Sequence, residues 1–273
     1  MALRLRDLFG VDKPIIAMLH LPGMPGRPRH DRAAGIDRLV DSVANDIAVL
    51  QATGIDGFLF CNEADLPYQL RVGPEVSASM AAVIGRVRPE IRRPFGVDLV
   101  WDPQASLAVA RATGAVFVRE AITGVSESDL GLMQPDFGAI AGYRTAIGAG
   151  SVMLFGNITP EFGSSLGRRD IAARAMSAAF LGLDAVLISG QITGTPTDLD
   201  DLRAAKAAIP ETPVLANTGV RAETVGEILS VADGTLVGTS LKVGADTWNP
   251  VDPDRAARFM DAARRAQQTV RVA

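Results

Sequence analysis

The sequence contains a single cysteine, Cys61, so the chain cannot form an internal disulfide bond. This cysteine content is typical of proteins in a reducing compartment, and we expect a cytoplasmic protein. No apolar run approaches the roughly 20 residues of a membrane span. The N-terminal segment, which includes Arg4, Arg6 and Asp7, lacks the apolar core of a signal peptide. The net charge of −4 gives no reason to expect a nucleic-acid partner. We therefore expect a soluble protein without an integral membrane segment.

The length and composition are sufficient for one large core. The chain has 273 residues, of which 48% are hydrophobic and 21% charged. A single (β/α)8 barrel takes about 250 residues, and a chain of this size buries roughly three-quarters of its unfolded surface. No linker or low-complexity segment interrupts the sequence. We predict one domain over residues 1–273, with residues 1–13 closing the bottom of a barrel.

Eight apolar β-type runs alternate with helical patterns along the chain. They comprise residues 15–21, 57–61, 95–100, 115–120, 151–156, 185–189, 214–216 and 235–238. Between residues 36 and 50 the apolar positions fall on one helical face. Such alternation indicates a parallel sheet with helical crossovers. A doubly wound open sheet would also alternate. Eight units, no GxGxxG after the first run and glycine turns after the last two favour a single (β/α)8 barrel.

Two turns near the C-terminus form a candidate anion site. They are Asn217-Thr218-Gly219 and Gly238-Thr239-Ser240, directly after the seventh and eighth runs. Glycine lets a backbone approach a ligand closely, and threonine and serine supply hydroxyl donors. Loops after strands 7 and 8 often bind phosphate in this fold. The alternative is that both are tight turns needing glycine for a positive φ. We predict that these six residues bind the phosphate of a small molecule.

Polar residues at the ends of the earlier runs are candidates for the chemistry. In a barrel these positions face the mouth, and His20, Glu63, Asp98 and Glu120 occupy them. The three carboxylates could bind Mg²⁺ or Mn²⁺, or they could move protons without a metal. Each also has a structural alternative: His20 could anchor a loop, Glu63 could bind backbone, and Glu120 could form a salt bridge towards a helix. Arg119 and Glu120 must point in opposite directions, because side chains alternate along a strand.

Two other reactive side chains have simpler interpretations. Cys61 ends a run and fits a core position better than a nucleophile, since no partner histidine is evident. Lys242 is the lysine nearest to the strand ends, and we expect it to neutralise phosphate rather than form an imine. The polar loop over residues 122–135 is of the long kind that carries function. That loop or the outer helices could also support a homo-oligomer.

Several motifs resemble the BtpA/SgcQ family over nearly the full length. They are M-L-H-L-P-G-M-P-G-R-P, C-N-E-A-D-L-P-Y, S-G-Q-I-T-G-T-P-T-D-L-D-D-L, P-V-L-A-N-T-G-V and V-A-D-G-T-L-V-G-T-S-L-K. The resemblance implies a TIM barrel. One branch of the family is linked to photosystem I biogenesis. Another is linked to sugar metabolism and has been described as a nucleotide phosphatase.

The middle of the chain departs from the family pattern towards carboxylates, in G-V-D-L-V-W-D-P, V-R-E-A-I-T-G and F-G-N-I-T-P-E-F. The resemblance therefore implies a phosphate-bearing ligand more strongly than it implies any particular reaction. We predict an enzyme acting on a sugar phosphate, as an isomerase, lyase or hydrolase. One alternative is a non-catalytic assembly factor. Another is a metal-dependent nucleotide phosphohydrolase, although the chain has no P-loop.

Overall fold

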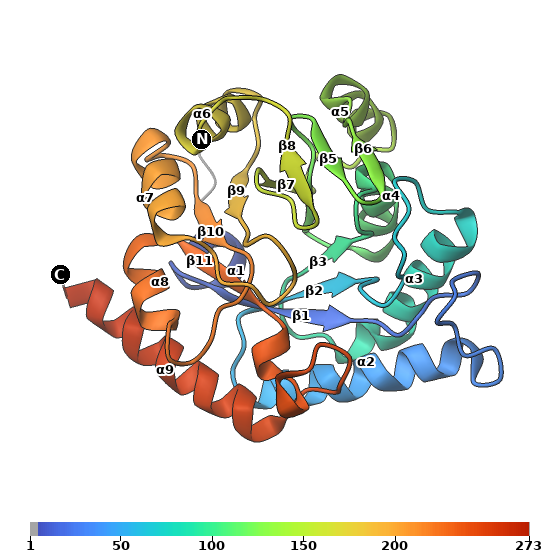
Figure 1. The fold of residues 1–273 in the computed structure, drawn as a ribbon. Helices are drawn as coiled ribbons and strands as arrows, with labels where there is room; N and C mark the ends of the chain where they lie inside the picture. Colours follow the sequence, from blue (N-terminus) through green and yellow to red (C-terminus); the bar gives the residue numbers. More distant parts are fainter. Residues whose placement is uncertain (1–4, 273) are drawn as a thin grey trace.

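A computed structural model describes residues 5–272. Eight parallel strands form a closed barrel in the order β1-β11-β10-β9-β7-β4-β3-β2, with helices around it (Figure 1). The barrel strands are β1 (Ile15–His20), β2 (Gly57–Cys61), β3 (Phe95–Asp98), β4 (Phe117–Glu120), β7 (Met153–Asn157), β9 (Ala185–Ile188), β10 (Val214–Ala216) and β11 (Gly234–Val237). The predicted (β/α)8 barrel is confirmed.

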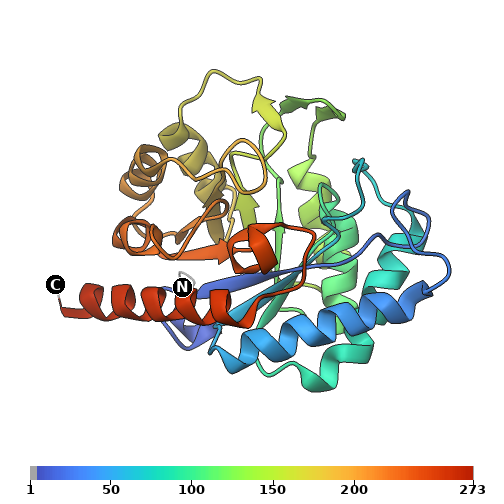
Figure 2. The same ribbon diagram turned by 60° about the horizontal axis from the view of Figure 1, so that its bottom comes forward.

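Helices surround the barrel, most of them on the outside of the strands. They are α1 (Leu5–Phe9), α2 (Gly35–Ala52), α3 (Pro74–Val87), α4 (Pro103–Thr113), α5 (Phe137–Ala146), α6 (Ile171–Phe180), α7 (Leu199–Ala208), α8 (Val225–Val231) and α9 (Pro253–Val272). Figures 1 and 2 show α9 running along the outside, next to α8. Short 3₁₀ turns follow α3 (η1, Arg88–Glu90) and β11 (η2, Thr239–Leu241; η3, Val243–Ala245). No helix in the described range is long and apolar enough to cross a membrane.

Alternation along each strand creates two apolar layers. On β1, Ile16 and Met18 belong to the cluster inside the barrel, whereas Ile15 and Ala17 belong to the cluster between strands and helices. Successive side chains of a strand point to opposite faces, so strands buried on both faces have continuous apolar sequences. The inner cluster also includes Phe9 of α1. The N-terminal segment therefore packs against the barrel interior, as predicted for residues 1–13 over the part that is described.

A small antiparallel sheet was not anticipated from the sequence. It consists of β5 (Ser126–Ser128), β6 (Gly131–Met133) and β8 (Gly163–Ser165), in the order β6-β5-β8. Figures 1 and 2 show it outside the barrel strands, near α5 and α6. The predicted loop over residues 122–135 thus contains a hairpin. Three-residue strands of serine and glycine are too short to show a period-two apolar pattern.

Lys242 forms a buried ion pair and does not face the barrel mouth. Its Nζ lies 2.6 Å from Oδ2 of Asp46 on α2, and both side chains are almost fully buried. The second oxygen, Asp46 Oδ1, accepts a hydrogen bond from the backbone N–H of Val251 at 2.8 Å. The prediction that Lys242 neutralises a bound phosphate is therefore wrong. Sequence position alone could not reveal that its long side chain turns back towards α2.

We expect Lys242→Met to lower the free energy of unfolding by about 3–5 kcal/mol, because it leaves the Asp46 carboxylate buried without its counter-charge. Urea denaturation monitored by circular dichroism measures this change. The half-exposed pair between Lys206 and Asp233 provides a matched control. Lys206→Met should cost about 1 kcal/mol or less. Equal losses in the two variants would contradict the proposed importance of burial.

Candidate active site

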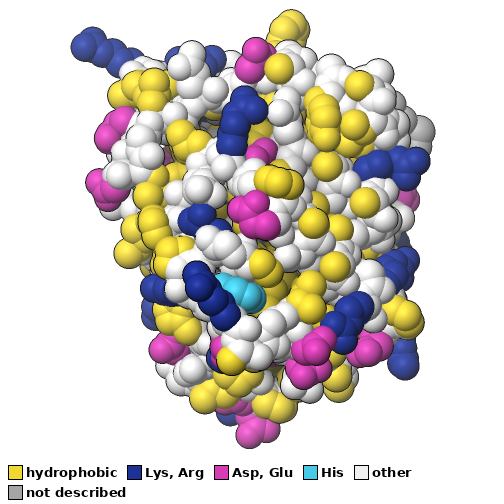
Figure 3. Space-filling view, turned by 90° about the vertical axis from the view of Figure 1, so that its right-hand side faces the viewer, with side chains coloured by type: hydrophobic (Ala, Val, Ile, Leu, Met, Phe, Trp, Pro, Cys, Tyr) yellow, Lys and Arg dark blue, Asp and Glu magenta, His cyan; other side chains and the backbone are white. Residues whose placement is uncertain are grey.

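A cavity of about 210 Å³ lies at the carboxyl-terminal ends of the barrel strands. Its lining comes from the ends of β1, β2, β4, β10 and β11, from the loops after β7 and β9, and from the start of α9. Figure 3 shows the face towards which the strands point, where basic, acidic and apolar side chains are interspersed. Active sites of (β/α)8 barrels lie at this end. The cavity is therefore the candidate active site.

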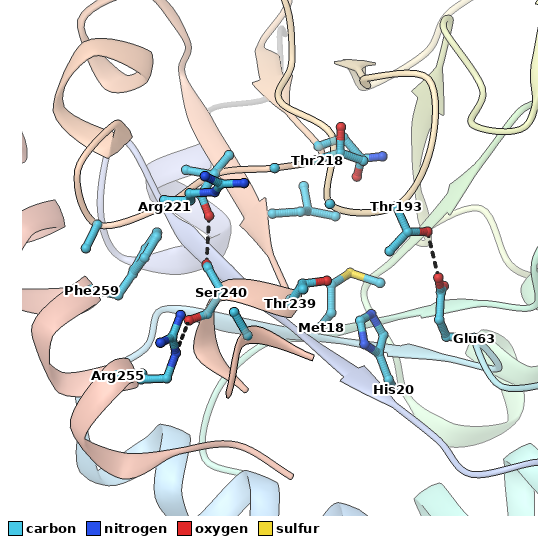
Figure 4. Close-up of a pocket in the computed structure, with 18 of the residues that line it drawn as sticks. Met18, His20, Glu63, Thr193, Thr218, Arg221, Thr239, Ser240, Arg255 and Phe259 are labelled. Carbon is cyan, nitrogen blue, oxygen red and sulfur yellow. Dashed lines mark hydrogen bonds between the residues drawn. The ribbon is translucent and has the colours of Figure 1, made fainter. Parts of the chain in front are cut away.

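One side of the cavity carries His20 and Glu63 (Figure 4). His20 is the last residue of β1, and Glu63 lies two residues beyond the end of β2. The hydroxyl of Thr193, in the loop after β9, donates to Glu63 Oε1 at 2.9 Å. The Cys61 thiol lies 3.5 Å from Glu63 Oε2. The structure therefore places two of the four predicted catalytic residues in this cavity, and the loop after β9 orients the Glu63 carboxylate.

His20 is an uncharged imidazole at neutral pH. Burial is the main cause that lowers its pKa to about 4, while nearby Glu63 partly opposes this shift. Its Nδ1 atom is buried and has no hydrogen-bond partner among the described residues. A Cβ atom at Gly238 would come within 2.8 Å of the His20 ring. Gly238 is therefore required to make room for the histidine, and its φ of −132° shows no need for a left-handed conformation.

The two predicted phosphate-binding turns form another part of the cavity wall. Gly219 has a φ of +65°, and a Cβ atom there would lie 2.4 Å from Pro196. Hence glycine at this turn has a structural reason, as the alternative interpretation held. The same contact presses the loop after β9 onto the turn after β10. This packing explains why S-G-Q-I-T-G-T-P-T and P-V-L-A-N-T-G-V form one unit of the site.

Most side-chain oxygens of these turns already have protein partners. Ser240 Oγ donates to the carbonyl of Val220 at 2.7 Å, and Thr218 Oγ1 accepts from the backbone N–H of Gly190. Thr239 Oγ1 lies 2.7 Å from Thr247 Oγ1. These hydroxyls hold the turns against neighbouring segments. Side-chain hydroxyls alone therefore make a weaker anion site than the sequence suggested.

Three arginines that the sequence analysis did not identify supply positive charge to the cavity. Arg221 follows the first turn, and Arg255 and Arg258 lie on one face of α9. Arg255 Nε donates to the Ser240 carbonyl at 2.9 Å, whereas Arg258 forms no ion pair among the described residues. The segment D-P-D-R-A-A-R could have indicated this pair of arginines, because residues three positions apart lie on the same face of a helix.

A buried arginine organises the floor of the site. Arg119 Nη2 lies 2.7 Å from Asp98 Oδ2, and Arg119 Nη1 donates to Asn217 Oδ1 at 3.0 Å. Glu161, from the loop after β7, lies 3.5 Å from Arg119 and accepts from Asn217 Nδ2 at 3.1 Å. Burial raises the pKa of Glu161, and the Arg119 guanidinium partly opposes this shift. The predicted phosphate ligand Asn217 thus has its amide engaged with this network.

Asp98 points into the barrel, but its main partner is Arg119. Burial raises the pKa of Asp98 to about 6, which leaves it ionised at neutral pH beside the guanidinium. The adjacent Cys61 thiol is buried, and burial with nearby carboxylates raises its pKa. A thiol in these surroundings is a poor nucleophile. We therefore assign a structural role in the site to Asp98 and Cys61.

Glu120 is separated from the cavity that contains His20 and Glu63. It follows the outward-facing Val118 by two positions, and its Oε1 accepts from Ser106 of α4. Its Oε2 is buried without a partner, and burial strongly raises the pKa of the carboxyl. Glu120 lines a smaller adjoining cavity, which Glu63 and Asp98 also line. Strand alternation explains this outcome, since Arg119 takes the inward position.

The carboxylates that were candidates for Mg²⁺ or Mn²⁺ do not form a ligand set. Within residues 5–272, no three histidine, cysteine, aspartate or glutamate side chains are grouped as metal ligands. Asp98 is paired with Arg119, and Glu120 with Ser106. The donor geometry therefore fits proton transfer by single carboxylates better than a metal held by all three.

Two of the motifs found in the sequence hold the rim of the barrel. The backbone N–H of Met24 donates to Asp65 Oδ1 at 2.8 Å, and Arg27 Nη2 donates to the Asp65 carbonyl at 3.0 Å. Asn62 Nδ2 donates to Asp65 Oδ2 at 2.9 Å. The proline-rich loop after β1 is thus fixed to the N-E-A-D segment after β2. Their role is to position His20 and Glu63 on adjacent strands.

We expect the His20 ring to titrate with a pKa near 4 in a proton NMR experiment on the folded protein. Protonation favours the unfolded chain, where histidine has a pKa near 6.5. Stability should therefore fall by about 2 kcal/mol between pH 7.5 and pH 5 on account of this residue. His20→Asn should remove that part of the decline, and His30→Asn should retain it. An unchanged pH profile in His20→Asn would contradict the assignment.

Comparison with known proteins was made for the whole chain. Residues 11–265 match the model of the BtpA family. The chain is 43% identical to the sgc region protein SgcQ of Escherichia coli (strain K12), over 94% of this chain and 96% of that protein. It is 28% identical to the photosystem I biogenesis protein BtpA of Synechocystis sp., over 93% of this chain and 89% of that protein.

Solved structures share the fold at low sequence identity. The "Native KDPGal structure" has a TM-score of 0.58 at 15% identity, covering 96% of this chain and 99% of that chain. N-(5'-phosphoribosyl)anthranilate isomerase from Pyrococcus furiosus has a TM-score of 0.52 at 13% identity, covering 93% and 99%. These likenesses show the fold alone. The family match and the relatives show that the chain belongs to the BtpA family.

Proposed function

We propose that the protein is an enzyme that moves a proton on a small phosphorylated sugar. One observation carries this proposal: His20 and Glu63 lie on one side of a cavity whose other side carries Arg221 and Arg255 (Figure 4), and Arg258 of α9 also lines this cavity. An acid–base pair facing a cationic wall matches a molecule with a reactive carbon skeleton at one end and an anionic group at the other.

The phosphate would bind between the arginines and the turns at Gly219 and Gly238. The first amide groups of a helical turn have no partner within that turn, and η2 begins directly after Gly238. Arginine donates to phosphate in a planar fork, so Arg258, which has no acidic partner in the described chain, is the main candidate. Thr218, Thr239 and Ser240 would hold these turns in place.

In the proposed step, Glu63 removes a proton from a hydroxyl-bearing carbon next to a carbonyl group and returns it to the former carbonyl carbon. The hydroxyl proton passes to the former carbonyl oxygen, so that the hydroxyl-bearing carbon becomes the new carbonyl. The neutral His20 imidazole donates a hydrogen bond to the carbonyl oxygen while negative charge develops there. Thr193 keeps the carboxylate oriented through its hydrogen bond. A neutral imidazole suits this role, because the buried ring does not carry a charge in the resting enzyme. The net reaction is an isomerisation.

Two other reaction types find less support in the side chains. A lyase that forms an imine needs a lysine in the cavity, and the three lysines of the chain all have other partners. Lys13 donates to the carbonyl of Ala232, Lys206 pairs with Asp233, and Lys242 pairs with Asp46. Hydrolysis of a nucleotide would need a site for a larger ligand. Two of the fold neighbours are named as phosphoribosyl anthranilate isomerases, which is consistent with chemistry on a phosphorylated sugar.

Phosphate recognition predicts that Arg258→Met weakens the binding of sugar phosphates by roughly tenfold or more, because a charge-assisted hydrogen bond is lost. A thermal-shift screen of aldose and ketose phosphates, nucleotides and their unphosphorylated counterparts identifies the ligand. Isothermal titration calorimetry then compares the variants. Arg265→Met, seven residues further along α9 and exposed, is the matched control. If Arg258→Met binds like Arg265→Met, the cationic wall does not hold the phosphate.

General base catalysis predicts that Glu63→Gln lowers kcat by roughly a hundredfold or more with little change in ligand affinity. The amide keeps the shape of the side chain but cannot accept the proton. Conversion of the sugar phosphate found in the screen, run in D₂O, should incorporate deuterium next to the carbonyl. Glu211→Gln, on an exposed loop, should behave as the wild type. Release of inorganic phosphate without deuterium incorporation would instead support a phosphohydrolase.

A non-catalytic assembly role is the second proposal. The Synechocystis relative is named for photosystem I biogenesis, and exposed apolar side chains occur at the end of α6. Met176, Phe180 and Leu181 are 50%, 90% and 44% exposed there. This surface could also support the homo-oligomer expected from the sequence. Full biological function of Glu63→Gln would favour the assembly role over catalysis. A cytoplasmic location is proposed from the single buried thiol.

A further inference from the structure

A second cavity lies away from the candidate active site. It measures about 110 Å³ and is lined by residues 123–126 after β4, by Ser165 of β8, by Gly167, and by residues of α6. No residue lines both this cavity and the one containing His20. The loops that line this cavity follow β4 and β7. Arg119 lies on β4, and Glu161 lies in the loop after β7. The cavity is thus beside the rim of the barrel but chemically distinct from its mouth.

Two arginines face this cavity without an acidic partner. Arg169 and Arg174 both line it, and neither takes part in an ion pair among the described residues. Arg169 Nη1 donates to Ser177 Oγ at 2.7 Å, while the half-buried Arg174 guanidinium donates to no protein atom in the described chain. Burial is the main cause that lowers the pKa of Arg174; the Asp201 carboxylate opposes this shift, and Arg169 adds a smaller lowering. An anion in the cavity would supply the partner that these two guanidinium groups lack within hydrogen-bond distance in the described chain.

Hydroxyl groups provide further donors around the same space. Ser126 and Ser165 are cross-strand partners in the small sheet, and Thr123 and Ser177 complete the polar lining. A water molecule occupies about 30 Å³ of the liquid, so the cavity has room for the equivalent of three or four waters. This size suits a tetrahedral oxyanion, whereas sites for drug-sized ligands measure about 300 Å³ or more.

We propose that this cavity binds a phosphate-type oxyanion, held by Arg174 and Arg169 with help from the surrounding hydroxyls. The bound anion would connect the loop after β4 to α6. It would offset the repulsion between the two guanidinium groups. It would also stiffen the loop after β4, which follows Arg119, and the loop after β7, which contains Glu161. The anion is either free inorganic phosphate or the phosphate group of a small metabolite. This inference does not depend on the proposed reaction at the mouth.

Isothermal titration calorimetry with inorganic phosphate tests the proposal on the full chain, in the Arg258→Met background so that the mouth contributes little. Arg174→Met should weaken phosphate binding by roughly tenfold or more, because a charge-assisted hydrogen-bond donor is lost. Arg168→Met removes an exposed arginine that does not line the cavity and serves as the control. Equal phosphate affinity in these two variants, or no phosphate binding in the Arg258→Met background, overturns the proposal.

A second arm uses glycerol 3-phosphate as the probe. Binding of both probes, each lost in Arg174→Met, indicates a site open to the phosphate group of a metabolite, and binding of inorganic phosphate alone indicates a free anion. If Arg174→Met fails to fold, Arg174→Lys keeps the charge without the planar fork and should show intermediate affinity. Wild-type affinity in Arg174→Lys and in Arg169→Met together would contradict the assignment. Because Arg258→Met reports on the mouth and Arg174→Met on this cavity, failure of one proposal is distinguishable from failure of the other.

Discussion

The Arg119 guanidinium inside the barrel is the interaction on which the site depends. Few groups are harder to bury than an unpaired charge, so this arginine requires acceptors on several sides. Asp98 comes from β3, Glu161 from the loop after β7, and Asn217 from the end of β10. One side chain thus links strand ends from across the barrel. The acidic residues nearest the centre are present largely because the arginine needs them.

This network leaves Glu63 as the carboxylate available for chemistry in the larger cavity. Glu161 also lines that cavity, but it is hydrogen-bonded to Asn157 and Asn217 and lies beside Arg119. Among the described residues, the hydrogen bonds to the Glu63 carboxylate come from the Thr193 hydroxyl and the Cys61 thiol. The pairing of Asp98 and Glu161 with Arg119 thus leaves the Glu63 carboxylate outside the ion pairs of this network.

The aromatic side chains beside Glu63 add a second constraint. Trp101 and Phe162 each lie with their ring centroid 6.0 Å from that of Tyr68, and both have a positive φ. Positive φ is costly for bulky residues and persists where the surroundings demand it. Tyr68 in turn donates to the carbonyl of Glu63 at 2.9 Å. The loops after β3 and β7 therefore accept backbone strain where their aromatic side chains line the smaller cavity beside Glu63.

The sequence by itself determined the barrel, because continuous apolar runs, helical faces and eight alternations leave few other ways to bury the same surface. It also located His20, Glu63 and the two glycine turns, since parallel strands must end at one face. Only the tertiary structure decided that Arg119 and not Glu120 faces inward, that Lys242 pairs with Asp46, and that α9 brings Arg255 and Arg258 to the cavity. The physical reason is that strand register and side-chain direction depend on partners distant in the chain. A one-residue change of register exchanges the inner and outer faces, and no local pattern specifies which acid a long basic side chain will reach.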